Sequence, residues 1–237
     1  MKRNALGRVI LYSLLILVLT GILVSAILSE FYLFQFSTGD NVPKEGHVAT
    51  SDVKRLEIDW VAGSVTIQKA NVDHIAFQES APDGCKYEME YSCENGTLVI
   101  SYGKQVFSFS IRSIPSKDLT ILVPMDWNCE ELSIEGISLD VSIQDLSVDQ
   151  MELDGISCEM VFSGKLQELQ IDGISCNVHL NLPQEWGFRM EEDGISCHLY
   201  TALPYSKHRG DFLYGNQGCT IFVDCISCDV HISEATS

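Results

Sequence analysis

The residues best suited to chemistry are nine cysteines and a few histidines, most of them in the second half of the chain. Cys225 and Cys228 are separated by two residues, a spacing used by redox dithiols and by zinc sites. A zinc site needs two further ligands, and Cys219 and His231 lie nearby in the sequence. Cys219, Cys225, Cys228 and His231 therefore form a candidate metal site. A thioredoxin-like motif is disfavoured, because it needs a helix N-terminus and this segment has strand character.

Cys225 and Cys228 belong to a short sequence phrase that the chain repeats five times with small variations. Each copy consists of an acid, usually a glycine, then Ile-Ser and usually a cysteine. The copies are Glu135–Leu139, Asp154–Cys158, Asp172–Cys176, Asp193–Cys197 and Asp224–Cys228. Their starting positions are separated by 19, 18, 21 and 31 residues. A near-constant period of this size is typical of stacked repeats.

Apolar residues alternate before and after each copy, which predicts two short strands per repeat. Ile171 and Ile174 are an odd number of positions apart, so we expect a bend at Asp172-Gly173, where glycine tolerates unusual backbone angles. Equivalent residues would then form an inward isoleucine column, an inward cysteine column headed by Leu139, and an outward serine column. The pattern predicts an all-β, single-stack β-solenoid or β-roll with coils of about 18–21 residues. An antiparallel β-sandwich, which also has regularly spaced short strands, is the alternative.

Further columns follow from this stacking. His179, Tyr200 and His231 share one outward position, and the acids of the five copies share another. Such columns suit a ligand stripe or a cation site, but a solvated polar face, with acids capping turn amides, is the favoured explanation. The inward cysteines are expected to be small core side chains. Neighbouring coils would also be close enough for disulfide bonds, such as one between Cys158 and Cys176.

The N-terminus has the composition of a membrane segment. Three basic residues lie within residues 1–8, and about 20 uncharged residues follow, enough for a helix of about 30 Å. The predicted organisation is a cytoplasmic N-terminus at 1–8, a transmembrane helix at 9–29, a spacer at 30–51 and an extracytoplasmic domain at 52–237. This predicts a single-pass protein of the cell membrane with a cytoplasmic N-terminus. A cleaved signal peptide is the alternative, because Val24-Ser25-Ala26 resembles a cleavage site.

The charge balance and the missing motifs narrow the classes of function. With 33 acidic and 15 basic residues the formal net charge is −18. Such a surface repels nucleic acid and anionic lipid headgroups, so neither is an expected ligand. Gly155–Glu159 resembles a nucleophile elbow only up to its fifth residue, which should be glycine. We expect no enzymatic activity and no cofactor.

The longest spacing, between the fourth and fifth copies, contains an insertion at residues 201–218. Insertions in stacked repeats form loops, often on a binding face. This one is aromatic and basic in an otherwise acidic region. Its candidate partner-binding residues are Tyr205, His208, Arg209, Phe212 and Tyr214.

Two local patterns precede the repeats. Asn95-Gly96 lies between the alternating runs Lys86–Ser92 and Thr97–Tyr102, which predicts a hairpin. The apolar run Leu119–Val123 ends at Pro124, which predicts a buried strand closed by a residue that cannot continue it.

Three segments and the repeats together resemble the bacterial putative-adhesin domain family. The segments are Trp60–Ile67, Glu94–Ile100 and Lys117–Pro124, and the resemblance covers roughly residues 53–233. It implies a β-solenoid-like domain of membrane-anchored envelope proteins, a family without agreed catalytic residues. This chain departs from the family pattern by placing Ile-Ser-Cys where members commonly have Ser-Gly-Asp.

The expected function is therefore a non-enzymatic binding or scaffolding module, adhesin-like or related to envelope stress. Its partners would be the membrane, through the N-terminal helix, and an envelope or surface protein or glycan. The alternative is a metal- or thiol-dependent site built on the cysteine and histidine columns.

Overall fold

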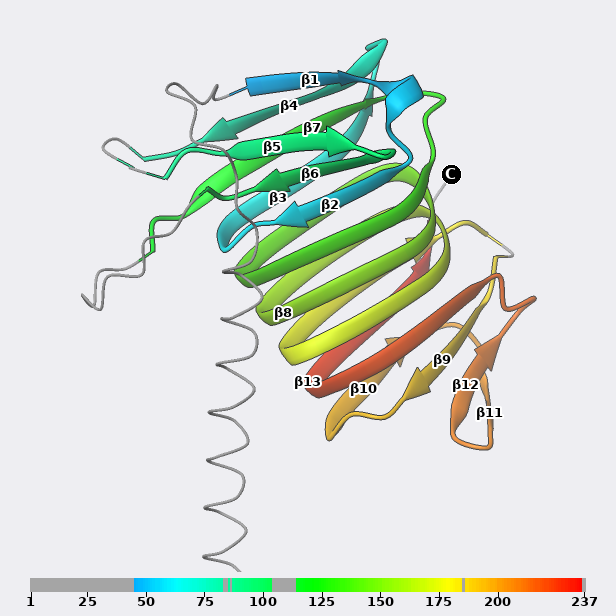
Figure 1. Cartoon of the computed structure of the whole chain (residues 1–237). Helices are drawn as coiled ribbons and strands as arrows, with labels where there is room; N and C mark the ends of the chain where they lie inside the picture. Colours follow the sequence, from blue (N-terminus) through cyan, green and yellow to red (C-terminus); the bar gives the residue numbers. More distant parts are fainter. Residues whose placement is uncertain (1–44, 83–84, 86, 104–113, 185, 236–237) are drawn as a thin grey trace, which may run out of the picture. The chain divides into compact units, whose positions relative to one another are not determined.

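The computed structural model describes residues 45–82, 85, 87–103, 114–184 and 186–235. All of them belong to the second of two units into which the chain divides, Val42–Ser237. Figure 1 shows their arrangement. The elements are β1 (Glu45–Ala49), a 3-10 turn (Thr50–Asp52), β2 (Arg55–Asp59), β3 (Ala62–Ala70), β4 (His74–Ser80), β5 (Glu90–Glu94), β6 (Thr97–Ser101), β7 (Lys117–Pro124), β8 (Cys129–Leu182), β9 (Phe188–Glu192), β10 (Ser196–Thr201), β11 (Ser206–His208), β12 (Asp211–Tyr214) and β13 (Cys219–Glu234).

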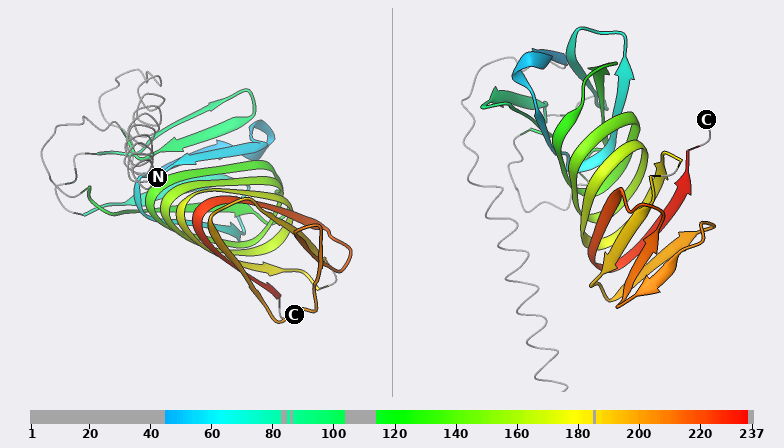
Figure 2. Two further views of the ribbon diagram at one scale, coloured as in Figure 1. Left: turned by 90° about the horizontal axis from the view of Figure 1, so that it is seen from below. Right: turned by 90° about the vertical axis from the view of Figure 1, so that its right-hand side faces the viewer.

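The strands form one mixed sheet of 13 strands. β8 is 54 residues long and winds through successive turns that lie one above another (Figures 1 and 2). β2, β3 and β13 pair with β8 in parallel. Antiparallel pairs extend the sheet at both ends, through β4 with β1 and β7 and through β12 with β9 and β11. The sheet therefore combines a parallel middle with antiparallel flanks.

The predicted single-stack β-solenoid is wrong, because pairing is mixed and the repeats do not stack in chain order. Cys228 of the fifth copy is in register with Cys176 of the third copy on one side. On its other side it is in register with Cys197 of the fourth copy. The fifth copy thus lies between the third and the fourth. The long insertion before β13 allows this order, because it gives the chain room to reverse and return.

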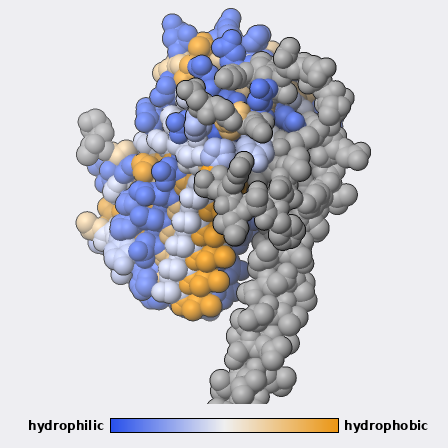
Figure 3. All heavy atoms as spheres, turned by 90° about the vertical axis from the view of Figure 1, so that its left-hand side faces the viewer, coloured by the Kyte–Doolittle hydropathy of each residue, from blue (hydrophilic) through white to orange (hydrophobic). Residues whose placement is uncertain are grey.

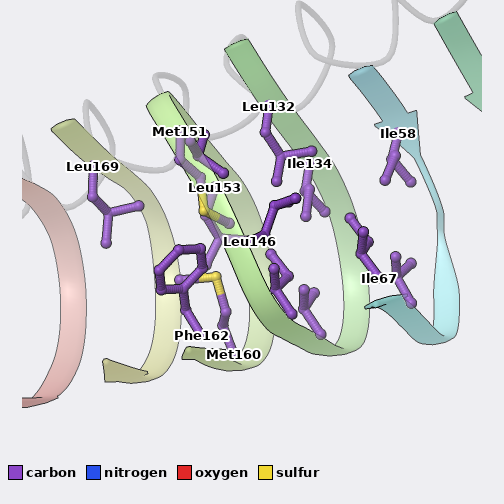
Figure 4. Close-up of a cluster of buried hydrophobic side chains, with 14 of the residues drawn as sticks. Ile58, Ile67, Leu132, Ile134, Leu146, Met151, Leu153, Met160, Phe162 and Leu169 are labelled. Atoms are coloured by element: carbon purple, nitrogen blue, oxygen red, sulfur yellow. The ribbon is translucent and has the colours of Figure 1, made fainter. Parts of the chain in front are cut away.

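The core lies inside the winding sheet. Leu132, Ile134, Leu153, Phe162 and Leu169 come from successive turns of β8 and are almost completely buried. Figure 4 shows how these side chains gather between the turns. Each lies at an inward position of an alternating strand, so the apolar alternation of the sequence defines the buried face. Burying such side chains contributes roughly 1.5–3 kcal/mol each.

The two local predictions before the repeats are confirmed. β5 pairs antiparallel with β6 around Asn95-Gly96, and both turn residues have positive φ, at 52° and 83°. β7 alternates buried and exposed residues and ends at Pro124. The end of the predicted spacer is part of the sheet, because β1 pairs with β4.

The membrane predictions are not supported. No helix within the described ranges is long and apolar enough to cross a bilayer, and the only helical element there is the short turn at Thr50–Asp52. The segment proposed as a transmembrane helix, residues 9–29, lies outside the described residues. The described residues therefore give no support to the predicted transmembrane helix, to the membrane as a partner or to the single-pass localisation.

Candidate functional site

The repeated phrase forms a bend in the winding sheet, and the structure shows which of its side chains face outward. In the second copy Gly155 and Cys158 are buried, whereas Asp154, Ile156 and Ser157 are exposed. Two consecutive outward residues shift the alternation by one position. The bend therefore lies at Ile-Ser and not, as predicted, at the acid-glycine pair.

In the second, third and fourth copies the glycine leaves room for the cysteine three positions later. A Cβ on Gly155 would lie 2.1 Å from Cys158 Sγ and 3.1 Å from the Gly136 carbonyl oxygen. A Cβ on Gly173 would lie 2.1 Å from the Gly155 carbonyl oxygen. Close approach of neighbouring turns, and not a special backbone angle, therefore explains these glycines.

The isoleucines of the five phrases point outward, which corrects the predicted inward column. We call them the isoleucine ladder. Its members are Ile137, Ile156, Ile174, Ile226 and Ile195, which are 39%, 43%, 46%, 52% and 84% exposed. In Figure 3 a hydrophobic column runs along the stacked turns beside a paler column, with hydrophilic surface on either side. The ladder places apolar side chains on a surface that is otherwise polar.

The acids of the phrases form a second outward column, two positions before the ladder. Burial raises the pKa of Asp154, and the neighbouring Asp172 raises it further. Asp172 accepts a hydrogen bond from Gln170 Nε2 at 2.7 Å. The same column continues into β2, where Asp59 is in register with Glu135. The Asp172 carboxylate thus lies close enough to Asp154 to disfavour the charge of Asp154.

A third outward column contains aromatic rings, as predicted from the shared position. The rings of His179 and His231 stack at 4.3 Å between centroids, and those of His231 and Tyr200 at 4.7 Å. Beside them His198 Nδ1 lies 3.4 Å from an Asp229 carboxylate oxygen. The order His179, His231, Tyr200 repeats the third, fifth, fourth order of the copies. The column forms a continuous aromatic strip.

All nine cysteines are free thiols. Cys158, Cys176 and Cys228 are buried and face inward as predicted, whereas Cys197 at the edge is only partly buried. Burial raises the pKa of Cys158 and of Cys219 to about 12. These two thiols are therefore protonated and unreactive near neutral pH.

The four residues considered as a metal site are not brought together. Cys219, Cys225 and Cys228 are buried inside the sheet, whereas His231 faces outward and stacks on His179. Within the described residues no group of three or more histidine, cysteine or acidic side chains is arranged to hold a metal ion.

The insertion between the fourth and fifth copies forms a hairpin in the sheet instead of a projecting loop. β11 and β12 pair antiparallel, and the turn residues Arg209 and Gly210 have positive φ. Phe212 is 9% exposed and packs against Tyr205 at 5.4 Å between ring centroids. Tyr214 Oη lies 3.0 Å from a Glu234 carboxylate oxygen. Phe212 and Tyr214 thus stabilise the hairpin.

The other three candidate residues of the insertion remain accessible. Tyr205 is 45% exposed, and His208 and Arg209 are exposed at the tip. Of the five predicted residues, two therefore stabilise the hairpin and three are exposed and accessible to a partner.

Sequence reasoning missed a buried lysine at the start of β7, where Lys117 pairs in parallel with Gly63 of β3. Lys117 Nζ donates to Glu79 Oε2 at 2.7 Å, to the Tyr102 carbonyl at 2.7 Å and to the Tyr87 carbonyl at 3.1 Å. It also lies over the rings of Trp60 and Tyr102, at 4.7 Å and 4.1 Å. Burial lowers the pKa of Lys117, and the Glu79 carboxylate opposes this shift. The sequence did contain an indication that Lys117 is buried. Lys117 is two and four positions from Leu119 and Ile121, so in a strand it faces the same side as these buried residues.

Together these features define a repetitive β protein whose turns present like residues in register on an exposed face. No family model matches the chain. No curated protein matches it either. Its fold resembles the crystal structure of a putative cell adhesion protein from Clostridium sporogenes, with a TM-score of 0.62 and 14% identity over 81% of this chain and all of that one.

Two further solved structures match with lower TM-scores. One is a putative adhesin from Bacteroides fragilis, with a TM-score of 0.39 and 10% identity over 80% of this chain and 96% of that one. The other is a putative lipid binding protein from Parabacteroides distasonis, with a TM-score of 0.28 and 11% identity over 82% of this chain and 98% of that one. At 14% identity and a TM-score of 0.62, the match to the Clostridium sporogenes structure establishes a similar fold and no more.

Proposed function

We propose that this protein is a non-enzymatic binding or scaffolding module of the adhesin-like type. The observation that carries the proposal is the isoleucine ladder, whose five side chains are 39–84% exposed at regular spacing on one face. Contiguous exposed apolar surface has a free-energy cost in water and is typical of interaction sites. The similarity in fold to a structure described as a cell adhesion protein agrees with this function.

The thiol-dependent alternative gains no support from the geometry. The thiols of Cys158 and Cys219 are buried, with pKa values raised to about 12. A thiolate is the reactive form of cysteine, and these environments disfavour it. The aromatic strip of His179, His231 and Tyr200 faces solvent and suits contact with a partner better than thiol chemistry.

The hairpin tip is a second candidate contact surface. Tyr205, His208 and Arg209 are exposed there, and Lys207 adds a further positive charge. Lys207 Nζ lies 4.2 Å from the centroid of the Phe212 ring and 3.9 Å from a Glu192 carboxylate oxygen. Because these contacts hold the tip in place, it could present its exposed side chains without a large ordering cost.

Affinity capture with the full-length protein tests the proposal. Immobilised wild type is compared with Ile156→Thr/Ile174→Thr on the ladder, Tyr205→Ser/His208→Ser on the hairpin, and Val161→Thr as a control. Val161 is 40% exposed but lies outside the ladder. We expect a protein or glycan from the source cells to be retained by wild type and control, and to be reduced several-fold by the ladder variant. Retention no greater than on blank resin would contradict a binding function.

A further inference from the structure

Charged residues flank the isoleucine ladder, and their charge indicates the chemistry of the molecule that binds there. Two positions before each isoleucine lies an acid of the phrase, and the acids Asp154 and Asp224 are exposed beside it. On the other side, beyond the uncharged serines, the outward position after the cysteine carries the exposed Asp140 and Glu159 and the partly buried Asp229. The ladder is therefore an apolar strip with carboxylates on both sides, and Asn177 and His198 occupy the other two places of the second row.

We propose that the isoleucine ladder binds a cationic amphipathic helix supplied by another molecule. This inference rests on the proposed binding function and names the chemistry of the partner. The apolar face of such a helix would cover the isoleucines, while lysine or arginine on its flanks would meet the two rows of carboxylates. Charge complementarity of this kind sets both specificity and the rate of association.

The spacing of the ladder fits a helix. Neighbouring strands are about 4.8 Å apart, so the four steps between five isoleucines span about 19 Å. A helix rises 5.4 Å per turn, so its apolar residues recur at nearly the same interval, and about 13 residues cover the ladder. An extended peptide would present alternate side chains about 6.8 Å apart, which fits the ladder poorly.

Repulsion between acids along the ladder favours a positively charged partner. Asp154 and Asp172 are close enough for the charge of Asp172 to disfavour that of Asp154. A cation placed between them would relieve this repulsion. The only histidine of the flanking rows, His198, lies on the edge strand β10 and pairs with Asp229 at 3.4 Å. The exposed carboxylates of Asp154, Asp224, Asp140 and Glu159 are placed to attract a positively charged partner.

The same charges disfavour two other occupants. A second copy of the chain would bring its own acidic rows against these, in a protein of formal net charge −18. A membrane surface carrying anionic lipids would be repelled for the same reason. Both become outcomes of the test.

The experiment measures binding of a fluorescently labelled model peptide to the full-length protein by anisotropy. The peptide has about 14 residues of leucine and lysine, ordered so that a helix is apolar on one face. A second peptide of identical composition, ordered so that its leucines spread around the helix, is the control ligand. The protein variants are Ile156→Thr/Ile174→Thr, Asp154→Asn/Asp172→Asn and, as the control, Val161→Thr.

We expect the amphipathic peptide to bind wild type at least tenfold more tightly than the control peptide. The isoleucine variant should lose at least tenfold in affinity, and the aspartate variant should lose affinity and show a shallower dependence on salt. Val161→Thr should change affinity less than twofold. Thr keeps β-branching at exposed positions, so these variants should fold, and their unfolding midpoints are measured alongside.

Equal binding of both peptides, or unchanged affinity in the isoleucine variant, would overturn the proposal. So would sedimentation showing a wild-type dimer that the isoleucine variant dissolves, or ladder-dependent binding to vesicles of anionic lipid. If affinity capture finds a ladder-dependent partner while the peptide does not bind, the binding function stands and the cationic helix is wrong.

Discussion

At the scale of single residues, burial disfavours the charged form of acids in the outward column that contains Asp154. Asp59 continues this column into β2, in register with Glu135. Burial raises its pKa to about 6, with a further contribution from Glu57. Its Oδ1 atom is buried and has no hydrogen-bond partner among the described residues. Asp59 is therefore an acid that folding favours in its protonated form.

This shift predicts a specific pH dependence. Since the pKa of Asp59 is raised from 3.8 to about 6, the folded state binds more protons than the unfolded state between these values. The free energy of unfolding should therefore fall as pH rises through this window, by at most about 3 kcal/mol, and then level off. Asp59→Asn should remove this decline and be more stable at pH 7 than wild type. Urea unfolding across the window measures both effects.

Asp193→Asn is the matched control for Asp59→Asn, because Asp193 belongs to the same column but is exposed. It should leave the pH dependence as in wild type. A decline of equal size in Asp59→Asn and wild type would show that another group causes it.

The thiols give a second prediction at this scale. Cys158 and Cys219 are buried with raised pKa values, whereas Cys85 and Cys93 are only partly buried. Under native conditions a thiol-alkylating reagent should label the partly buried Cys85, Cys93 and Cys197 first, and Cys158 and Cys219 only after denaturation. Peptide mass mapping of the labelled protein identifies the sites. Rapid native labelling of Cys158 would contradict the inward cysteine column.

At the scale of elements, the bend depends on the fit between a glycine and the cysteine three residues later. Two consecutive outward residues, such as Ile156 and Ser157, allow the strand to bend without losing its pairing. The inward glycine then leaves space for the cysteine sulfur. In the second copy the glycine and the cysteine therefore fit together by volume, whereas in the fifth copy Cys225 takes the place of the glycine.

Gly155→Ala tests this fit. The added Cβ would lie 2.1 Å from Cys158 Sγ, so we expect overpacking to lower the free energy of unfolding by about 1–3 kcal/mol. Adding Cys158→Ala should recover part of that loss, although Cys158→Ala alone destabilises by leaving a cavity. Chemical unfolding of the four proteins of this cycle measures the coupling.

Gly173→Ala provides the contrast to Gly155→Ala. Its closest obstacle is the Gly155 carbonyl oxygen at 2.1 Å, which no side-chain substitution removes. Cys176→Ala should therefore fail to rescue it. Equal rescue at both positions would show that the backbone can move apart, and that the obstacle we assign to Gly173 is wrong.

At the scale of the whole domain, the order of the turns differs from the order of the sequence. β13 pairs with β8 over fourteen positions on one side and with β9 and β10 on the other. β10 pairs only with β13 among the described strands. The C-terminal copy therefore lies within the sheet, and the fourth copy lies at its edge.

Hydrogen–deuterium exchange should show this order directly. Amides of β13 between Ile221 and Ile232 should exchange among the slowest, because neighbouring strands cover them on both sides. Amides of β10 should exchange much faster, because the edge strand opens locally. Mass spectrometry of peptides from both strands gives the comparison. Slower exchange in β10 than in β13 would require the repeats to stack in chain order.

The sequence predicted local features well where one residue type has one structural role. Asn95-Gly96 predicted the β5–β6 hairpin, because few residues accept positive φ so readily. The shared position of His179, Tyr200 and His231 predicted one outward column, but chain order predicted Tyr200 and not His231 next to His179. The isoleucines were assigned to the wrong face, because alternation was counted through the bend as though the shift occurred at glycine.

The sequence by itself determined that the chain forms strands with inward cysteines and repeated bends, since these follow from the spacing of neighbouring residues. Only the tertiary structure decided that the isoleucines face solvent, that Lys117 is buried beside Glu79, and that β13 enters between the third and fourth copies. The physical reason is that spacing along the chain fixes local strand geometry. The order in which the turns stack depends on pairing between segments that are far apart in the sequence. The spacing of residues in one sequence does not specify those pairings.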